Sequence, residues 1–324
     1  MSIRIEESTF DDLLNGALKY LFAKGAPCKA TRGDFREILG PTFVLTNPRA
    51  RLSRSEGRSK IFSAVGELLW YLSKSNELDY IDWFVPNKYR DESPDNKTVR
   101  SGYGNRLFNW RGIDQVQNVI DLLNEKPSSR QAVIQILDAE DVHSEEAAIP
   151  CTCTLQFLLR DGLLHLMVSM RSNDAYFGFP HDVFAFTMLQ ELIARTLNVE
   201  LGNYIHTVGS FHLYDEHAVG AHEYLREGFQ NIIPMAPMPI GDPWNVIKNI
   251  LQFEAELRVN PFIEIPAMDP YWADICRLLA IYSLTKSKPQ GALVASEKIV
   301  GTIANKTYGM FIDARISRLR DNDV

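Results

Sequence analysis

The stretch that decides the fold is PCTCTLQFLLRDGLLHLMVSMRSNDAYFGFPHDVFAFTMLQELIARTLNVELGNYIHTVGSFHLY, residues 150–214. Its first part predicts a β-hairpin with strands at 154–160 and 163–170. These strands are joined by Asp161-Gly162, a pair that suits a tight turn with positive φ. The apolar pattern from Asp182 to Leu197 then predicts a long buried helix.

Helical and strand-like periodicity continues on both sides of this stretch. Thr9 is expected to cap a first helix that lasts until Gly25. Further helices are expected near 60–73, 113–124, 217–227, 243–257, 271–284 and 292–304, and further strands at 132–137 and 204–213. After about residue 236 only Pro-rich connections and helices follow. We therefore expect an α+β domain at 1–235 and a mostly helical C-terminal extension at 236–324.

The composition indicates a large folded core and an acidic surface. The chain has 324 residues, 45% of them hydrophobic, and a formal net charge of -7. A net negative charge argues against broad nucleic-acid binding, because surfaces that follow phosphates usually carry a surplus of Lys and Arg. The basic run from Arg49 to Lys60 is either a solvated loop, which we favour, or a local phosphate or nucleic-acid site.

Cysteine usage and hydropathy indicate the compartment. Cys28, Cys151, Cys153 and Cys276 lie too far apart in the sequence for a dense disulfide scaffold. The sequence has neither an N-terminal apolar signal nor a twenty-residue apolar span. A reducing cytoplasm is therefore expected, without membrane attachment.

Several polar groups within 150–214 suit covalent chemistry on a phosphorylated heterocycle. A thiolate attacks and leaves readily, so Cys151 is the candidate nucleophile, and Arg171 is expected to lower the pKa of its thiol. The planar fork of Arg171 matches phosphate oxygens, and the hydroxyl of Ser172 adds a donor. Asp182 either contacts a bound base or is an ordinary helix N-cap. Cys153 is interpreted as structural.

The order and spacing of these motifs resemble the thymidylate synthase superfamily, and within it the branch that hydroxymethylates cytosine nucleotides. The matching motifs are Pro150-Cys151, Gln156-Phe157, Arg171-Ser172-Asn173-Asp174, Gly178 to Asp182 and Val208-Gly209-Ser210-Phe211-His212-Leu213-Tyr214. The resemblance implies a three-layer α+β fold, with a large mixed β-sheet and packed helices, in which 1–235 is the catalytic domain. It also implies an enzyme that transfers one-carbon groups.

By the same resemblance, a pyrimidine nucleoside monophosphate contacts polar residues spread along the chain. The residues that match nucleotide contacts of the family are Arg32, Arg130, Gln131, Arg171, Ser172, Asn173, Asp174, Asp182, His212 and Tyr214. Arg130 is expected to reach the phosphate bound by the other subunit, which implies a homodimer. The chain departs from the family at Gln131, where a second arginine is usual. The phosphate clamp and the choice between ribose and deoxyribose therefore stay open.

The resemblance also assigns residues around the reacting base and its one-carbon donor, 5,10-methylenetetrahydrofolate. The matching catalytic residues are Cys151, Glu67, Asp182 and Tyr103, and the residues near the folate are Asp174, Gly178, Phe179 and Trp83. Glu67 is either a snorkelling surface residue or a buried carboxylate with a raised pKa, and the family match favours the second. No metal is implied.

Asp182 is the residue on which the choice of base depends. Members of the family that use dUMP carry asparagine here, whose amide donates to O4 and accepts from N3–H of uracil. Cytosine reverses both edges, so a carboxyl that shares a proton fits it better. The C-terminal residues 317–324 also lack the short tail that closes the folate site of the synthases. The sequence therefore predicts a CMP or dCMP 5-hydroxymethylase in which water completes the reaction, and the alternative is a thymidylate synthase that converts dUMP to dTMP.

Two further functional classes fit the sequence less well. The motifs His143-Ser144-Glu145 and Pro150-Cys151-Thr152-Cys153 superficially suggest a zinc nucleotide deaminase, but that chemistry needs Pro-Cys-x-x-Cys and a longer separation. The other class is a non-catalytic member of the superfamily that binds nucleotides or RNA. The presence of both Cys151 and Asp182 argues against it.

Overall fold

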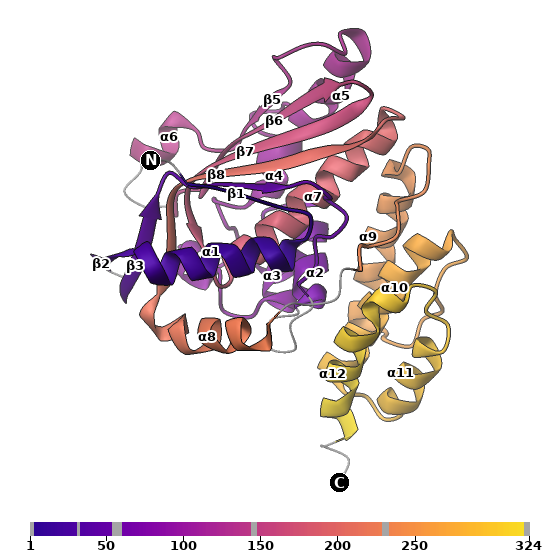
Figure 1. The fold of residues 1–324 in the computed structure, drawn as a ribbon. Coiled ribbons are helices and arrows are strands. Elements are labelled where there is room, and N and C mark those ends of the chain that lie inside the picture. Colours follow the sequence, from indigo (N-terminus) through magenta and orange to yellow (C-terminus); the bar gives the residue numbers. More distant parts are fainter. Residues whose placement is uncertain (1–2, 31–32, 54–59, 144–147, 229–232, 321–324) are drawn as a thin grey trace.

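The computed structural model describes residues 3–30, 33–53, 60–143, 148–228 and 233–320. Within them the chain forms a mixed eight-stranded sheet with helices packed on it, which confirms the α+β class (Figure 1). The strands are β1 (Arg4–Glu7), β2 (Ala26–Ala30), β3 (Gly33–Leu39), β4 (Thr42–Leu45), β5 (Val133–Gln135), β6 (Thr152–Arg160), β7 (Leu163–Asp174) and β8 (Glu200–Tyr214). Their order is β1-β4-β8-β7-β6-β5, and β3 pairs with β2 and β8.

Strands β6 and β7 form the predicted hairpin. Asp161 and Gly162 have φ values of 51° and 74°, as a turn with two left-handed residues requires. β7 extends four residues beyond its expected end, to Asp174, because β8 pairs with it over these residues, with Ser172 opposite Ser210. The extension places the whole 171–174 motif in the sheet.

Helix α7 (Gly178–Thr196) is the crossover between β7 and β8, which run parallel and cannot be joined by a tight turn. It begins four residues before its predicted start, since Pro180 is tolerated in the first turn of a helix. Asp182 therefore lies inside the helix, 9% exposed, and the N-cap interpretation of Asp182 is wrong.

The other helices lie on the sheet or beside the helices that cover it. They are α1 (Phe10–Lys24), α2 (Ile61–Leu72), α3 (Leu78–Phe84), α4 (Tyr103–Phe108), α5 (Gln115–Glu125), α6 (Ala139–His143), α8 (Ala218–Glu227), α9 (Trp244–Val259), α10 (Pro270–Ser287), α11 (Ala292–Val300) and α12 (Gly309–Arg320). α1 is capped as expected, because the Thr9 side chain accepts a hydrogen bond from the Asp12 N–H. α12 has no counterpart in the predictions.

The C-terminal helices α9–α12 pack beside α2 and α3 (Figure 1). Tyr282 of α10 stacks on Phe84 of α3 with ring centroids 5.0 Å apart, and its hydroxyl donates a hydrogen bond to the Trp83 carbonyl. These contacts belong to the same hydrophobic cluster as the core above the sheet. A division of the chain at residues 235/236 stays a prediction.

The basic run 49–60 is only partly described, because residues 54–59 lie outside the described part of the chain. Arg51 is fully buried and forms an ion pair with Glu191 of α7. The solvated-loop interpretation is therefore wrong for Arg51. The ion pair attaches this segment to α7 and supplies the carboxylate partner that a buried guanidinium needs.

A buried ion pair supports the position of α4. Arg106 donates to both carboxylate oxygens of Asp141, at 2.8 and 2.7 Å, and neither side chain is more than 1% exposed. We expect Asp141→Ala to lower the free energy of unfolding by about 3–5 kcal/mol, because it leaves a buried cation unpaired. Glu297→Ala removes the exposed partner of Arg320 and is expected to cost less than about 1 kcal/mol. Urea unfolding measures both variants, and similar small losses would contradict the prediction.

Candidate functional site

A cavity of about 480 Å³ opens where the ends of β7 and β8 meet α2, α4 and the first turns of α7. Most of the site residues expected from the sequence line it. These are Glu67, Tyr103, Cys151, Arg171, Ser172, Asn173, Asp174, Gly178, Asp182, His212 and Tyr214. The fold thus gathers in one place residues that are widely separated in the sequence.

Cys151 lies directly before β6 and is held against β7. The backbone N–H of Arg171 donates to the Cys151 carbonyl at 2.8 Å, and Arg171 Nη2 lies 3.8 Å from the Cys151 sulfur. The Arg171 guanidinium also donates to the carbonyls of Pro150 and Ile149, at 2.9 and 2.6 Å. Burial raises the pKa of the Cys151 thiol, and the opposing effect of Arg171 is smaller. Arg171 thus lowers the pKa of the Cys151 thiol as expected, but burial outweighs this effect and the net shift is upward.

Asp182 ends a buried chain of hydrogen bonds. The Asn173 amide nitrogen donates to Asp182 Oδ2 at 2.7 Å, and Asn173 Oδ1 lies 3.1 Å from His206 Nε2. Because an amide oxygen only accepts, His206 carries its proton on Nε2 and accepts from the Tyr204 hydroxyl, 2.7 Å from Nδ1. Burial lowers the pKa of His206 to about 3, so the ring stays neutral. This chain fixes the orientation of Asn173 toward Asp182.

The carboxyl of Asp182 is suited to holding a proton. Burial, and then the charge of Glu67, raise its pKa to about 7, against the smaller opposing effects of Lys88 and Asn173. Gly178 makes the close packing possible, because a Cβ there would lie 2.9 Å from the Asn173 amide nitrogen. Near neutral pH a substantial fraction of Asp182 is therefore protonated.

Glu67 of α2 is a second buried carboxyl, 3% exposed. Its Oε1 accepts hydrogen bonds from the hydroxyls of Tyr71, at 3.1 Å, and Tyr89. Burial raises the pKa of Glu67, but Lys88, His181 and the two hydroxyls together lower it below its ordinary value. The expected rise in the pKa of Glu67 is therefore wrong. Among the residues described, Glu67 Oε2 has no hydrogen-bond partner, so it is an acceptor for a ligand or water.

Tyr103 closes another side of the cavity. Its hydroxyl accepts hydrogen bonds from the backbone N–H and the side chain of Thr152, at 3.2 and 2.9 Å. Burial, with the charges of Asp182 and Cys151, raises the pKa of Tyr103 well above its ordinary value. The hydroxyl therefore keeps its own proton, which it can donate into the cavity.

Strands β7 and β8 form the side of the cavity that faces the sheet. The His212 and Tyr214 rings meet edge to face at 5.1 Å, and Ser172 Oγ lies 3.4 Å from His212 Nδ1. Asp174 accepts from the backbone N–H groups of Tyr176 and Phe177, at 3.0 and 2.9 Å, and so shapes the turn into α7.

Two of the expected phosphate contacts lie elsewhere. Arg130 and Gln131 lie immediately before the edge strand β5, are exposed, and do not line the cavity. The Arg130 carbonyl accepts a hydrogen bond from Gln156 of β6 at 2.9 Å. Arg32 lies outside the described residues.

Two residues expected near the folate also lie away from the cavity surface. Phe179 is fully buried and packs on Phe43 and Phe211, with centroids 5.0 and 5.2 Å away. Trp83 faces the C-terminal helices, where its ring lies 4.3 Å from Lys286 Nζ.

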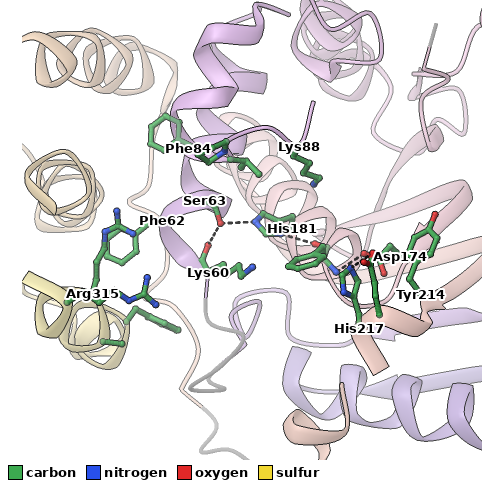
Figure 2. A pocket seen from close by; sticks show the side chains of 17 residues that line it. Lys60, Phe62, Ser63, Phe84, Lys88, Asp174, His181, Tyr214, His217 and Arg315 are labelled. Carbon is green, nitrogen blue, oxygen red and sulfur yellow. Dashed lines mark hydrogen bonds and ion pairs between the residues drawn. The ribbon is translucent and has the colours of Figure 1, made fainter. Parts of the chain in front are cut away.

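Other side chains at the site were missed by the sequence analysis. Lys88 and Tyr89 line the cavity from the segment after α3, where no motif marks them. His181 also lines it, and could have been suspected from its place beside Asp182. Its Nδ1 donates to the Phe177 carbonyl and its Nε2 lies 2.9 Å from Ser63 Oγ (Figure 2). Burial lowers the pKa of His181 to about 4.

No group of three or more His, Cys, Asp or Glu residues suited to a metal ion is found in the described part of the chain. Of the motif that suggested a zinc deaminase, Ser144 and Glu145 lie outside the described ranges. None of the helices in these ranges is long and apolar enough to cross a bilayer.

A sequence model of the family described as thymidylate synthase matches residues 55–253, more than half of the chain. The chain belongs to the thymidylate synthase family. A thymidylate synthase of Buchnera aphidicola subsp. Baizongia pistaciae is 32% identical over 158 residues, which cover 47% of this chain and 60% of the relative. One of Bacillus phage phi3T is 33% identical over 162 residues, covering 48% and 58%. The matched region thus spans less than two thirds of these relatives.

The fold also resembles that of a solved thymidylate synthase structure. The thermostable thymidylate synthase A of Bacillus subtilis superposes with a TM-score of 0.57 over 70% of this chain and 86% of its own, at 23% sequence identity. This confirms the expected thymidylate synthase-like fold.

The raised pKa of Asp182 predicts a pH-dependent cost in stability. Its ordinary pKa of 3.8 rises to about 7 in the folded protein, so its stabilising neutral form is lost as pH rises through 7. Relative to Asp182→Asn, the wild type is expected to lose on the order of 4 kcal/mol between pH 4 and pH 8. Urea unfolding of both proteins across this range measures the difference. Asp313→Asn, an exposed control, is expected to stay within about 0.5 kcal/mol of wild type, and a pH-independent difference for Asp182→Asn would refute the assignment.

Proposed function

We propose that this protein adds a hydroxymethyl group to C5 of a cytosine nucleoside monophosphate, CMP or dCMP, with 5,10-methylenetetrahydrofolate as the donor. The observation that carries the proposal is the buried, partly protonated carboxyl of Asp182 in the same cavity as the Cys151 thiol. A protonated carboxyl donates to N3 of cytosine and accepts from its 4-amino group. Uracil presents N3–H and O4, which is the opposite pattern.

The first steps use Cys151 and Asp182. Addition of the Cys151 thiolate to C6 moves electrons into the ring, where transfer of the Asp182 proton to N3 neutralises them. C5 then becomes nucleophilic and forms a bond to the donor's methylene carbon, while the bond between that carbon and N10 of the folate breaks. Loss of the C5 proton breaks the remaining bond to N5, which releases tetrahydrofolate and leaves an exocyclic methylene on the ring. The two folate nitrogens take up the C5 proton and the proton that N3 received from Asp182.

The last step is addition of water. Hydroxide adds to the exocyclic methylene while the Cys151 thiolate leaves C6, which restores the C5–C6 double bond. The proton from this water goes to Glu67, whose lowered pKa keeps it ionised and ready to accept. The transferred carbon keeps the oxidation level of formaldehyde, so no reductant is consumed.

The nucleotide phosphate is assigned to Arg171 and Ser172. Nε and Nη2 of Arg171 are engaged by the backbone, so Nη1 is the part of the fork left for phosphate. Arg130 and Gln131 are exposed on the β5 side of the sheet. We assign them to the phosphate bound by the second subunit of a homodimer. Tyr214 and His212 are assigned to the sugar.

Thymidylate synthase activity is the second candidate, and the names of the relatives favour it over hydroxymethylation. In that reaction hydride from the folate, rather than water, reaches the exocyclic carbon and gives dTMP and dihydrofolate. The carboxyl at position 182 is the feature that argues against it, because uracil matches an amide.

Product analysis with CMP, dCMP, dUMP and UMP distinguishes the two activities. We expect a hydroxymethylated cytosine nucleotide and tetrahydrofolate, and Asp182→Asn is expected to lower this turnover about 10²–10⁴-fold, because the proton for N3 is lost. Mass spectrometry identifies the nucleotide product. A methylated uracil product with dihydrofolate would make the protein a thymidylate synthase instead.

Exchange of the C5 hydrogen of the cytosine nucleotide with solvent tests the nucleophile. Cys151→Ala is expected to lower the exchange and turnover rates at least about 10³-fold, because exchange requires addition at C6. Cys153→Ala is the matched control, since Cys153 does not line the cavity, and should retain both rates. Unchanged exchange and turnover in Cys151→Ala would refute the role of Cys151 as the nucleophile.

A further inference from the structure

A second cavity, of about 730 Å³, adjoins the first. The two share five lining residues, Lys88, Asp174, Phe177, His181 and Tyr214. The far side of the second cavity is formed by α12, through Phe311, Ala314, Arg315 and Arg318. In Figure 2, Phe62 and Arg315 lie on one side of this cavity and Asp174, Tyr214 and His217 on the other. A ligand in the second cavity therefore reaches from α12 to the reaction cavity.

The lining of the second cavity combines aromatic surface with positive charge. Phe62, Phe84 and Phe177 supply aromatic surface. The cations are Lys60, Lys88, Arg315 and Arg318, and the carboxylates are Asp174 and Glu216. Both carboxylates already have partners, because Asp174 accepts two backbone N–H groups and Glu216 lies 3.5 Å from His217 Nε2. The α12 side is therefore suited to carboxylates attached to an aromatic body.

Arg315 is held firmly in this wall. Its Nε donates to Thr285 Oγ1 at 2.5 Å, and its guanidinium lies 4.3 Å from the ring centroid of Tyr282 and 4.9 Å from that of Phe62. Burial lowers the pKa of Arg315 to about 10, so it remains charged at neutral pH. No carboxylate among the described residues forms an ion pair with it. A partly buried cation without such a partner favours an anionic ligand.

We propose that α12 is the wall of the one-carbon donor site and that Arg315 and Arg318 bind the glutamate carboxylates of the folate. The inference rests on the proposed function for the identity of the donor. The aminobenzoyl ring packs against the aromatic side chains, and the pterin extends toward Asp174 in the shared region. α12 lies beyond residues 55–253, which match the family, so this contact belongs to the additional C-terminal segment of the chain.

The test compares ligands with and without glutamate. Isothermal titration in the presence of CMP or dCMP measures the Kd of tetrahydrofolate, its triglutamate and tetrahydropteroate, which lacks glutamate. Arg318→Gln is expected to weaken the two glutamate-bearing ligands about tenfold, the triglutamate more than the monoglutamate, and to leave tetrahydropteroate unchanged. Arg320→Gln is the matched control, because Arg320 is on the same helix, is similarly exposed and pairs with Glu297 outside the cavity.

The outcomes separate this inference from the proposed function. Equal folate affinity in Arg318→Gln and wild type, or an equal loss for tetrahydropteroate, overturns the role of α12 even if the enzyme turns over nucleotide. Absence of folate binding by the wild type overturns it as well. Glutamate-dependent binding that is lost in Arg318→Gln, in a protein that converts no nucleotide, supports the donor site and overturns the proposed reaction.

Discussion

The parallel register of β7 and β8 is the constraint on which the site depends. Ser172 lies opposite Ser210, and Asp174 lies opposite His212. A slip of one residue would turn every side chain of one strand to the other face of the sheet. The same β7 pairs with β6 in the hairpin and so holds Cys151 beside Arg171. One ladder of backbone hydrogen bonds therefore sets the distances among the Cys151 thiol, the Arg171 guanidinium and the side chains of β8.

The pKa values of two buried carboxyls in the cavity are shifted in opposite directions. Burial raises the pKa of both carboxyls. Glu67 is surrounded by donors and positive charge, which together bring its pKa below the ordinary value, whereas Asp182 has one amide donor and the Glu67 charge nearby, and its pKa is raised to about 7. Separated pKa values of this kind assign an acid and a base within one site. In the proposed reaction Asp182 is the proton donor and Glu67 the acceptor, and the neutral His206 and Asn173 hold the Asp182 carboxyl in place.

Features set by neighbours in the chain could be predicted from the sequence. The Asp161-Gly162 turn and the Thr9 cap depend on a few adjacent residues, and both are confirmed. The family motifs marked most of the residues that line the cavity, and the hairpin indicated the β6–β7 pairing beside it. Contacts between distant segments could not be read in this way. The burial of Arg51 depends on Glu191, 140 residues away, and the pKa of Glu67 depends partly on Lys88, which no motif marks.

In the proposed reaction, the selection of cytosine and the use of water both follow from the charge of Glu67. An ionised, buried carboxylate with an unpaired oxygen among the described residues attracts a water molecule far more strongly than an apolar wall does. Burial raises the pKa of Asp182 most, and the same charge raises it further and so helps to keep the proton that cytosine requires. Removing the charge, as in Glu67→Gln, would weaken both effects together. The base that is bound and the group that finishes the reaction are therefore coupled electrostatically, although different residues contact them.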